Sequence, residues 1–134
     1  MFISAVVGLL DITQRKFTYS NAGHCYPLLF DSDGECSNLD IGGCLLGIEP
    51  AIDYHTATID LPAGSTLFLY TDGIPDMIDK DENDFGTDRL IESLKKCLDL
   101  PAAEIGHTIL EAVNEHCGEI NQFDDCTLIV IKSL

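Results

Sequence analysis

The residues best suited to chemistry are aspartates that lie next to two apolar, strand-like segments. Asp72 follows the segment 66–71, and Asp124 with Asp125 comes directly before the segment 126–131. If the two segments pair as antiparallel strands, the end of the first lies beside the start of the second, so the carboxylates meet at one edge of a sheet. Several carboxylates held close together repel one another unless a cation neutralises them, which favours a hard divalent ion such as Mg²⁺ or Mn²⁺.

Position alone leaves a second explanation for each of these aspartates. An aspartate beside a strand also serves as a turn former or a helix cap. Gly73, directly after Asp72, lets the backbone turn sharply there, and that suits either explanation. The choice between them depends on further motifs.

Length and charge limit the classes of function. A chain of 134 residues with 46% apolar content has room for one core. Its 23 acidic and seven basic side chains give a net charge of −16, which repels nucleic acid and anionic lipid. The longest apolar run, residues 2–10, is about half of what a membrane helix needs and lacks the features of a secretory signal. We therefore expect a cytoplasmic protein that binds neither nucleic acid nor membrane.

The cysteines form no C-x-x-C pair. Cysteine often packs as a small buried hydrophobe, so we expect scattered thiols rather than disulfides or a zinc site. The six positions are Cys25, Cys36, Cys44, Cys97, Cys117 and Cys126.

The hydrophobic pattern predicts three β-hairpins, then two helices and a last strand. The hairpins join 2–10 to 16–20, 27–30 to 35–39, and 56–61 to 66–71, and the first of these strands is expected to be covered from two sides. Apolar residues at helical spacing predict one helix capped by Thr87 and a second that starts after Pro101 and ends near Gly118. A buried strand at 126–131 closes the chain. Together these elements predict an α+β domain with a largely antiparallel sheet.

Five short motifs occur in an order that resembles a known family. They are Asn21-Ala22-Gly23-His24, Leu46-Gly47-Ile48, Leu69-Tyr70-Thr71-Asp72-Gly73-Ile74, Phe85-Gly86 before a helix, and Asp124-Asp125-Cys126-Thr127. The sequence resembles the SpoIIE/RsbU-type serine phosphatases, a bacterial branch of the type 2C metal-dependent (PPM-type) protein phosphatases. The resemblance covers nearly the whole chain, and residues 1–134 correspond to the C-terminal part of a single catalytic domain.

The resemblance implies an α-β-β-α phosphatase fold, a largely antiparallel β-sandwich flanked by helices, with two Mn²⁺ or Mg²⁺ ions. It carries the roles of metal ligand and catalytic residue to Asp72 and Asp124, and the expected metal-binding set is completed by Gly73 and Asp125. The implied reaction is hydrolysis of phosphoserine or phosphothreonine by metal-activated water. The implied partner is a phosphorylated regulatory protein such as an anti-sigma-factor antagonist.

The sequence departs from the family in one respect. The remaining family ligands belong to an N-terminal D-x-x-G-H-G-like segment, which does not precede Met1 in this sequence. We therefore expect a fold that is incomplete at the N-terminus, weak metal binding at one site at most, no activity of this chain alone, and self-association through residues 1–10. The alternative function is a non-catalytic protein-interaction module or a degenerate phosphatase.

Other candidate residues receive structural interpretations. For His24 we predict a structural hydrogen-bonding role, and for His55, His107 and His116 solvated side chains. The acidic run 79–84 could be mistaken for a calcium loop, but its sixth position is Asp84 rather than glycine and its twelfth is Leu90 rather than glutamate. A mobile acidic loop between a strand and a helix is the prediction there.

Overall fold

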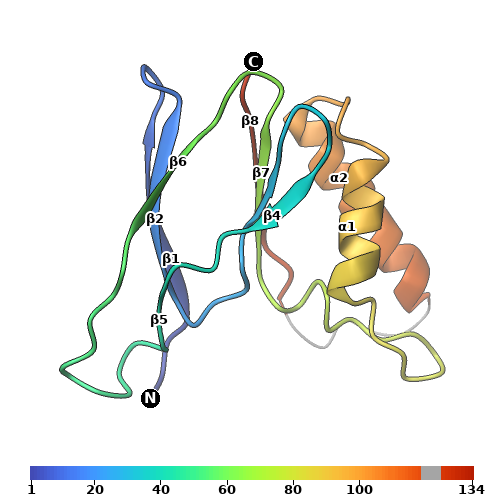
Figure 1. The fold of residues 1–134 in the computed structure, drawn as a ribbon. Coiled ribbons are helices and arrows are strands. Elements are labelled where there is room, and N and C mark those ends of the chain that lie inside the picture. Colours follow the sequence, from blue (N-terminus) through green and yellow to red (C-terminus); the bar gives the residue numbers. More distant parts are fainter. Residues whose placement is uncertain (119–124) are drawn as a thin grey trace. The chain divides into compact units, whose positions relative to one another are not determined.

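The structure is a computed structural model that describes residues 1–118 and 125–134, and it divides into two compact units (Figure 1). The first unit holds residues 1–65 and 133–134, and the second holds residues 66–132. The described strands are β1 (Ala5–Asp11), β2 (Lys16–Ala22), β3 (Leu28–Phe30), β4 (Cys36–Asn38), β5 (Gly42–Gly43), β6 (Ala57–Asp60), β7 (Thr66–Tyr70) and β8 (Leu128–Lys132); the helices are α1 (Thr87–Lys95) and α2 (Ala102–Cys117). The predicted α+β class, with mostly antiparallel sheets, is confirmed.

The first unit is built on the hairpin of β1 and β2. The two strands pair one to one from Ala5 opposite Ala22 to Asp11 opposite Lys16, as the sequence predicts. On its other side β2 pairs antiparallel with β6 and, near its end, parallel with the short strand β5. A Cβ atom at Gly42 in β5 would lie 1.8 Å from the carbonyl oxygen of Asn21, so only glycine allows this approach. Nothing in the sequence pattern had indicated β5.

The first strand differs from its prediction. Val7 and Leu9 have 71% and 73% of their surface exposed, so the expectation that this strand is covered from two sides is wrong. The physical reason is its position, because among the described residues β1 pairs with β2 alone and ends the sheet. Apolar composition predicted burial here, whereas the strand lies at an edge.

The second predicted hairpin is confirmed. Strand β3 pairs antiparallel with β4 across a tight turn in which Gly34 has a φ of 80°. The Asp31 carboxylate accepts hydrogen bonds from the N–H groups of Asp33 and Glu35, both at 2.9 Å. Local turn chemistry is therefore enough to fix this hairpin.

The third predicted hairpin is wrong. Strand β6 pairs with β2, and β7 pairs with β8, so the two strands that flank residues 62–65 do not pair with each other. The connecting residues instead bond to the C-terminal end of the chain. Gly64 donates its N–H to the carbonyl oxygen of Ser133 at 2.8 Å, and Ser133 donates to that of Ser65 at 2.9 Å. The turn indicated by Pro62-Ala63-Gly64-Ser65 does form, because the N–H of Ser65 donates to the carbonyl oxygen of Pro62 at 3.1 Å, but the strands on its two sides pair elsewhere.

In the second unit, β7 and β8 form an antiparallel pair and the two helices contact each other. Helix α2 packs on β8 through Gly106, where a Cβ would meet the Leu128 side chain at 3.1 Å. The helical core is fully or almost fully buried and consists of Leu90, Leu94, Ile105, Ile109 and Val113. These positions recur every three or four residues, which is the spacing that predicted the helices.

The helix ends differ slightly from the prediction. Gly86 occupies the N-cap position of α1, so Thr87 is the first helical residue rather than the cap. Pro101 occupies the N-cap position of α2 without a side-chain capping bond, and Gly118 follows the helix with a φ of 62°, so the helix starts and ends where the sequence predicts. The six cysteines are all thiols, also as predicted. Within the described ranges no helix has the length and apolar character needed to cross a bilayer.

Candidate functional site

The end of β7 lies beside the start of β8. Their ladder runs from Thr66 opposite Lys132 to Tyr70 opposite Leu128. The residues that follow Tyr70 are therefore next to those that precede Leu128, which confirms the antiparallel pairing expected for the strands beside the two aspartate motifs.

Thr71 links the two motifs directly. Its hydroxyl donates a hydrogen bond to the carbonyl oxygen of Asp125 and accepts one from the N–H of Thr127, both at 3.0 Å. Its own N–H donates to the carbonyl oxygen of Thr127 at 3.0 Å. A fourth bond runs from the Cys126 thiol to the carbonyl oxygen of Gly73 at 3.0 Å. The backbone on both sides of Asp72 is thereby tied to residues 125–127, a role of Thr71 and Cys126 that we did not predict from the sequence.

Asp72 projects its carboxylate from a single helical turn. The N–H of Asp76 donates to the backbone carbonyl of Asp72 at 2.9 Å, and that of Ile74 donates to the carbonyl of Thr71 at 3.1 Å. Asp72 is exposed, and among the described residues its carboxylate has no hydrogen bond or ion pair. Both carboxylate oxygens are thus accessible to a ligand.

The other predicted site residues divide into two groups. Asp125 is exposed and adjoins the Thr71 bridge, and Gly73 is buried beneath it. Asp124 lies outside the described residues. In the part of the chain that the structure describes, no three His, Cys, Asp or Glu side chains converge as a metal-binding group. The described carboxylates have the hard oxygen donors that Mg²⁺ and Mn²⁺ prefer, but they provide only part of a ligand set.

The Asn-Ala-Gly-His motif is held by its own asparagine. Asn21 is buried; its side-chain oxygen accepts the N–H of His24 at 2.7 Å, and its amide donates to the carbonyl oxygen of His24 at 3.0 Å. The His24 ring bonds to the hydroxyl of Ser4 at 2.9 Å. These contacts agree with the structural role predicted for His24.

The acidic run 79–84 is organised by Asp79. Its carboxylate accepts the N–H groups of Asp81 and Asn83 at 2.8 and 2.9 Å, together with the Asn83 side-chain amide. The backbone hydrogen bond from Asn83, followed by its side-chain bond, lowers the pKa of Asp79. The loop is therefore closed by its own hydrogen bonds, which is more order than the prediction of a mobile loop implied.

His116 joins this loop to both helices. Its Nε2 bonds to the carbonyl oxygen of Asn83 at 2.9 Å, its Nδ1 bonds to the guanidinium of Arg89, and its ring meets that of Phe85 edge-on. The prediction of a solvated His116 is wrong, because partners 27 and 33 residues away fold back onto it. His55 and His107 are exposed as predicted, and His107 lies 3.1 Å from the carboxylate of Glu111 on its own helix.

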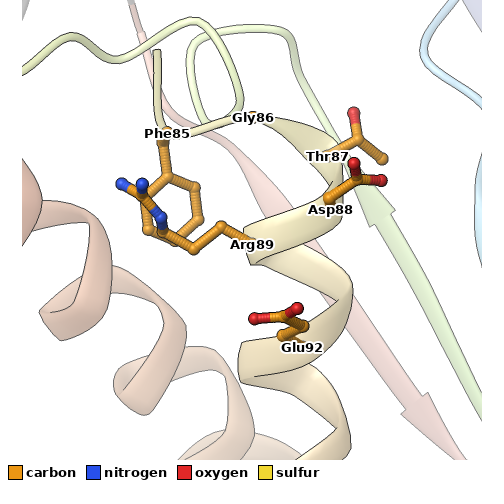
Figure 2. A pocket seen from close by; sticks show the side chains of 6 residues that line it. All are labelled: Phe85, Gly86, Thr87, Asp88, Arg89 and Glu92. Atoms are coloured by element: carbon orange, nitrogen blue, oxygen red, sulfur yellow. The ribbon is translucent and has the colours of Figure 1, made fainter. Parts of the chain in front are cut away.

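A hollow of about 470 Å³ lies at the start of α1 (Figure 2). In Figure 2 the Arg89 guanidinium lies over the Phe85 ring, 5.6 Å from its centroid, while Thr87 and Asp88 point away from that ring. Glu92 lines the hollow one turn further along the helix. The hollow is open, and none of the predicted metal-site residues lines it.

Comparisons with known proteins give a consistent result. The family described as Stage II sporulation protein E (SpoIIE) matches residues 1–133. Protein IcfG of Synechocystis sp. is 30% identical over 131 residues, which are 98% of this chain and 20% of IcfG. Phosphoserine phosphatase RsbP of Bacillus subtilis is 24% identical over 130 residues, which are 97% of this chain and 30% of RsbP. The chain therefore spans less than a third of these two relatives.

Solved structures share the fold. The SiaA-PP2C domain of Pseudomonas aeruginosa superposes with a TM-score of 0.82 at 26% identity, covering 96% of this chain and 51% of that domain. The SpoIIE phosphatase domain of Bacillus subtilis presoaked with Mn has a TM-score of 0.68 at 18% identity, covering 97% of this chain and 56% of that one. RsbX in complex with magnesium has a TM-score of 0.61 at 23% identity, and the match covers 95% of this chain and 54% of RsbX. The two-helix, two-sheet arrangement thus matches PP2C phosphatase domains.

Proposed function

Because this chain belongs to the SpoIIE family of PP2C-type serine phosphatases, we propose that it forms part of a metal-dependent serine/threonine protein phosphatase. The reaction is hydrolysis of phosphoserine or phosphothreonine on a regulatory protein. The substrate class we propose is a phosphorylated anti-sigma-factor antagonist or a similar regulator, and the compartment is the cytoplasm. One relative of the fold combines RsbU and RsbW domains in a single protein, which fits a regulatory partner.

The observation that carries this proposal is the hydrogen-bonded junction of β7 and β8. The Thr71 hydroxyl fixes the backbone beside Asp72 against that of Asp125, and the Cys126 thiol adds a second link to Gly73. A turn former would need none of these long-range bonds. Their combination with an accessible Asp72 carboxylate favours a ligand-binding edge over a purely structural one.

The residues that would hold divalent ions are Asp72 and Asp124, with Gly73 and Asp125 as neighbours in the site. A bound Mg²⁺ or Mn²⁺ pair in such a phosphatase lowers the pKa of a coordinated water and orients it toward the phosphoryl group. The part played by this chain is to present oxygen donors with fixed spacing. The Thr71 hydroxyl holds the two motifs together, and the turn from Thr71 to Asp76 leaves the Asp72 carboxylate exposed.

We further propose that the ligand set is completed by residues outside this chain. The described residues hold no group of three metal-binding side chains, and the phosphatase domain of SiaA is about twice as long as the part that this chain covers. Residues 1–134 alone are then expected to bind metal weakly, at one site at most, and to release no phosphate. The incomplete set also supports the alternative, a non-catalytic interaction module or degenerate phosphatase.

The test is phosphate release from a phosphoserine peptide by the complete gene product that contains these residues, with Mn²⁺ and with Mg²⁺. The proposal predicts metal-dependent turnover that falls at least about a hundredfold in the Asp72→Asn variant. Asp99→Asn, an exposed aspartate between the helices, is the matched control and leaves turnover unchanged. Absence of turnover with either ion contradicts the phosphatase proposal and favours the interaction module.

A further inference from the structure

The Phe85-Gly86 motif bonds to the residues that follow Asp72. The N–H of Gly86 donates to the carbonyl oxygen of Pro75 at 2.8 Å, and the N–H of Phe85 donates to that of Met77 at 2.6 Å. The chain leaves the Asp72 turn, closes the acidic loop and then returns to the same turn before α1 begins. The start of α1 is therefore held against the turn that carries Asp72.

This turn is fixed from two directions. The Thr71 hydroxyl ties its first residues to the start of β8, and the Phe85-Gly86 motif ties its last residues to the start of α1. Ile74 is fully buried and Met77 is almost fully buried, whereas Asp72 is exposed. Asp72 is thus an exposed residue of a turn whose other residues are packed in the core.

Gly86 has a backbone conformation that few residues other than glycine adopt. Its φ of 79° and ψ of 154° fall in a region that is essentially restricted to glycine. A Cβ at this position would meet nothing within 4 Å, so the restriction comes from the backbone and not from a lack of space. In this conformation the N–H of Gly86 bonds to Pro75, while its carbonyl oxygen accepts the N–H of Leu90 in the first turn of α1 at 3.1 Å (Figure 2).

His116 of α2 holds the motif on both sides. Its ring meets the Phe85 ring edge-on, with centroids 5.5 Å apart. Its Nε2 bonds to the carbonyl oxygen of Asn83 before the motif, and its Nδ1 bonds to the guanidinium of Arg89 after it. Helix α2 thereby fixes the segment that returns to the Asp72 turn.

We propose that Gly86 and His116 are positioning residues for Asp72. Both act through the backbone of the turn, and they set the direction in which Asp72 presents its carboxylate. Metal affinity depends on such outer contacts, because they orient the groups that bind the ion. The inference rests on the proposed role of Asp72 as a metal ligand, and its test therefore includes a measurement made without metal.

The first test is amide hydrogen exchange, followed by mass spectrometry, of the complete gene product that contains these residues, without added metal. In Gly86→Ala we expect residues 72–78 to exchange at least about fivefold faster, because opening of the turn relieves the backbone strain. Gly34→Ala is the matched control, since Gly34 has a φ of 80° in the β3–β4 turn, and it leaves exchange of residues 72–78 unchanged. Unchanged exchange in Gly86→Ala, or an equal increase in the control, overturns the proposal.

The second test is a Mn²⁺ titration of the same proteins by calorimetry. At the site that Asp72→Asn weakens, we expect Gly86→Ala to bind about tenfold more weakly than the wild type, and Gly34→Ala to bind like the wild type. If Asp72→Asn binds as tightly as the wild type, the metal role of Asp72 is wrong and the inference fails with it. If Asp72→Asn binds weakly but Gly86→Ala binds like the wild type, the positioning role alone is wrong.

A second variant covers the case in which Gly86→Ala does not fold, as judged by circular dichroism. His116→Phe keeps a ring against Phe85 and deletes both hydrogen bonds of the imidazole. We expect it also to accelerate exchange of residues 72–78, whereas His107→Phe, at an exposed position of the same helix, does not. Equal exchange in these two variants overturns the positioning role of His116.

Discussion

At the scale of single residues, Thr71 and Asp79 each organise a loop through side-chain hydrogen bonds to the backbone. Thr71 joins segments that are more than fifty residues apart, whereas Asp79 closes a loop of five residues. The first arrangement ties together the backbone beside the predicted metal-site residues, and the second closes the acidic loop on itself.

Replacing Thr71 by valine keeps the shape of the side chain and deletes its hydroxyl. The N–H of Thr127 and the carbonyl oxygen of Asp125 then lose their partner, so we expect a loss of about 1–2 kcal/mol in the free energy of unfolding. Urea denaturation measures the change. Thr71→Ser retains the hydroxyl and is the control, and no loss of stability in Thr71→Val would mean that the two hydrogen bonds contribute nothing.

Asp79 makes stability depend on pH in a defined direction. Hydrogen bonds from Asn83 lower the pKa of Asp79 in the folded state, so its carboxylate stabilises the fold above the unfolded pKa of about 4. That contribution is lost as the pH falls through the lower folded pKa. We expect the stability advantage of wild type over Asp79→Asn to be full at neutral pH and to shrink in this acid range, as measured by urea denaturation at several pH values. Asp81→Asn in the same loop is the control, and a pH-independent difference for Asp79→Asn would contradict the assignment.

Residue patterns predicted some of these roles and missed others. The location of Asp72 at a strand end and the structural character of His24 follow from neighbouring residues, so the sequence indicated both. His116 acquires its partners Arg89 and Asn83 only through the chain fold, and no local pattern reports such contacts. The bridging role of Thr71 was missed for the same reason.

At the scale of elements, His116 connects α2 to the start of α1 and to the preceding loop. It bonds to Arg89 and to the carbonyl oxygen of Asn83, and it packs against Phe85. This cluster holds the segment that leads from the Asp72 turn into the helices, because Phe85 is 3% exposed and the N–H of Phe85 donates to Met77.

We expect His116→Ala to lower the free energy of unfolding by about 1–3 kcal/mol, since a ring contact and two hydrogen bonds are lost. His107→Ala on the same helix is the matched control. Its partner Glu111 is 61% exposed, so the change should be about 0.5 kcal/mol or less. Thermal or urea unfolding followed by circular dichroism distinguishes the two, and equal effects would show that the cluster adds no stability.

Element prediction succeeded where turn chemistry is local. The hairpins β1–β2 and β3–β4 are closed by short polar turns, and both helices follow from the spacing of apolar residues. The prediction that β6 pairs with β7 is wrong. Strand β6 pairs with β2 and β7 pairs with β8, and these partners are distant in sequence, so the turn residues between β6 and β7 do not reveal them. The prediction that β1 is buried on both faces is wrong, because its apolar composition does not distinguish an edge strand from a central one.

At the scale of the whole molecule, the chain matches one family along nearly its full length while it spans about half of the related SiaA phosphatase domain. Among its described residues, Asp72 and Asp125 are both exposed at the hydrogen-bonded junction of β7 and β8. We propose that a partial site of this kind binds a divalent ion weakly, because few ligands replace the hydration shell.

The most direct measurement is a Mn²⁺ titration by calorimetry of residues 1–134 beside the Asp72→Asn variant, with Asp99→Asn as the control. The proposal predicts weak binding at one site by the wild type and the control, with a dissociation constant in the range of about 0.1–1 mM, and no binding by Asp72→Asn. Equal binding by all three proteins, or no binding by any of them, would contradict the claim that the β7–β8 junction presents Asp72 as a metal ligand.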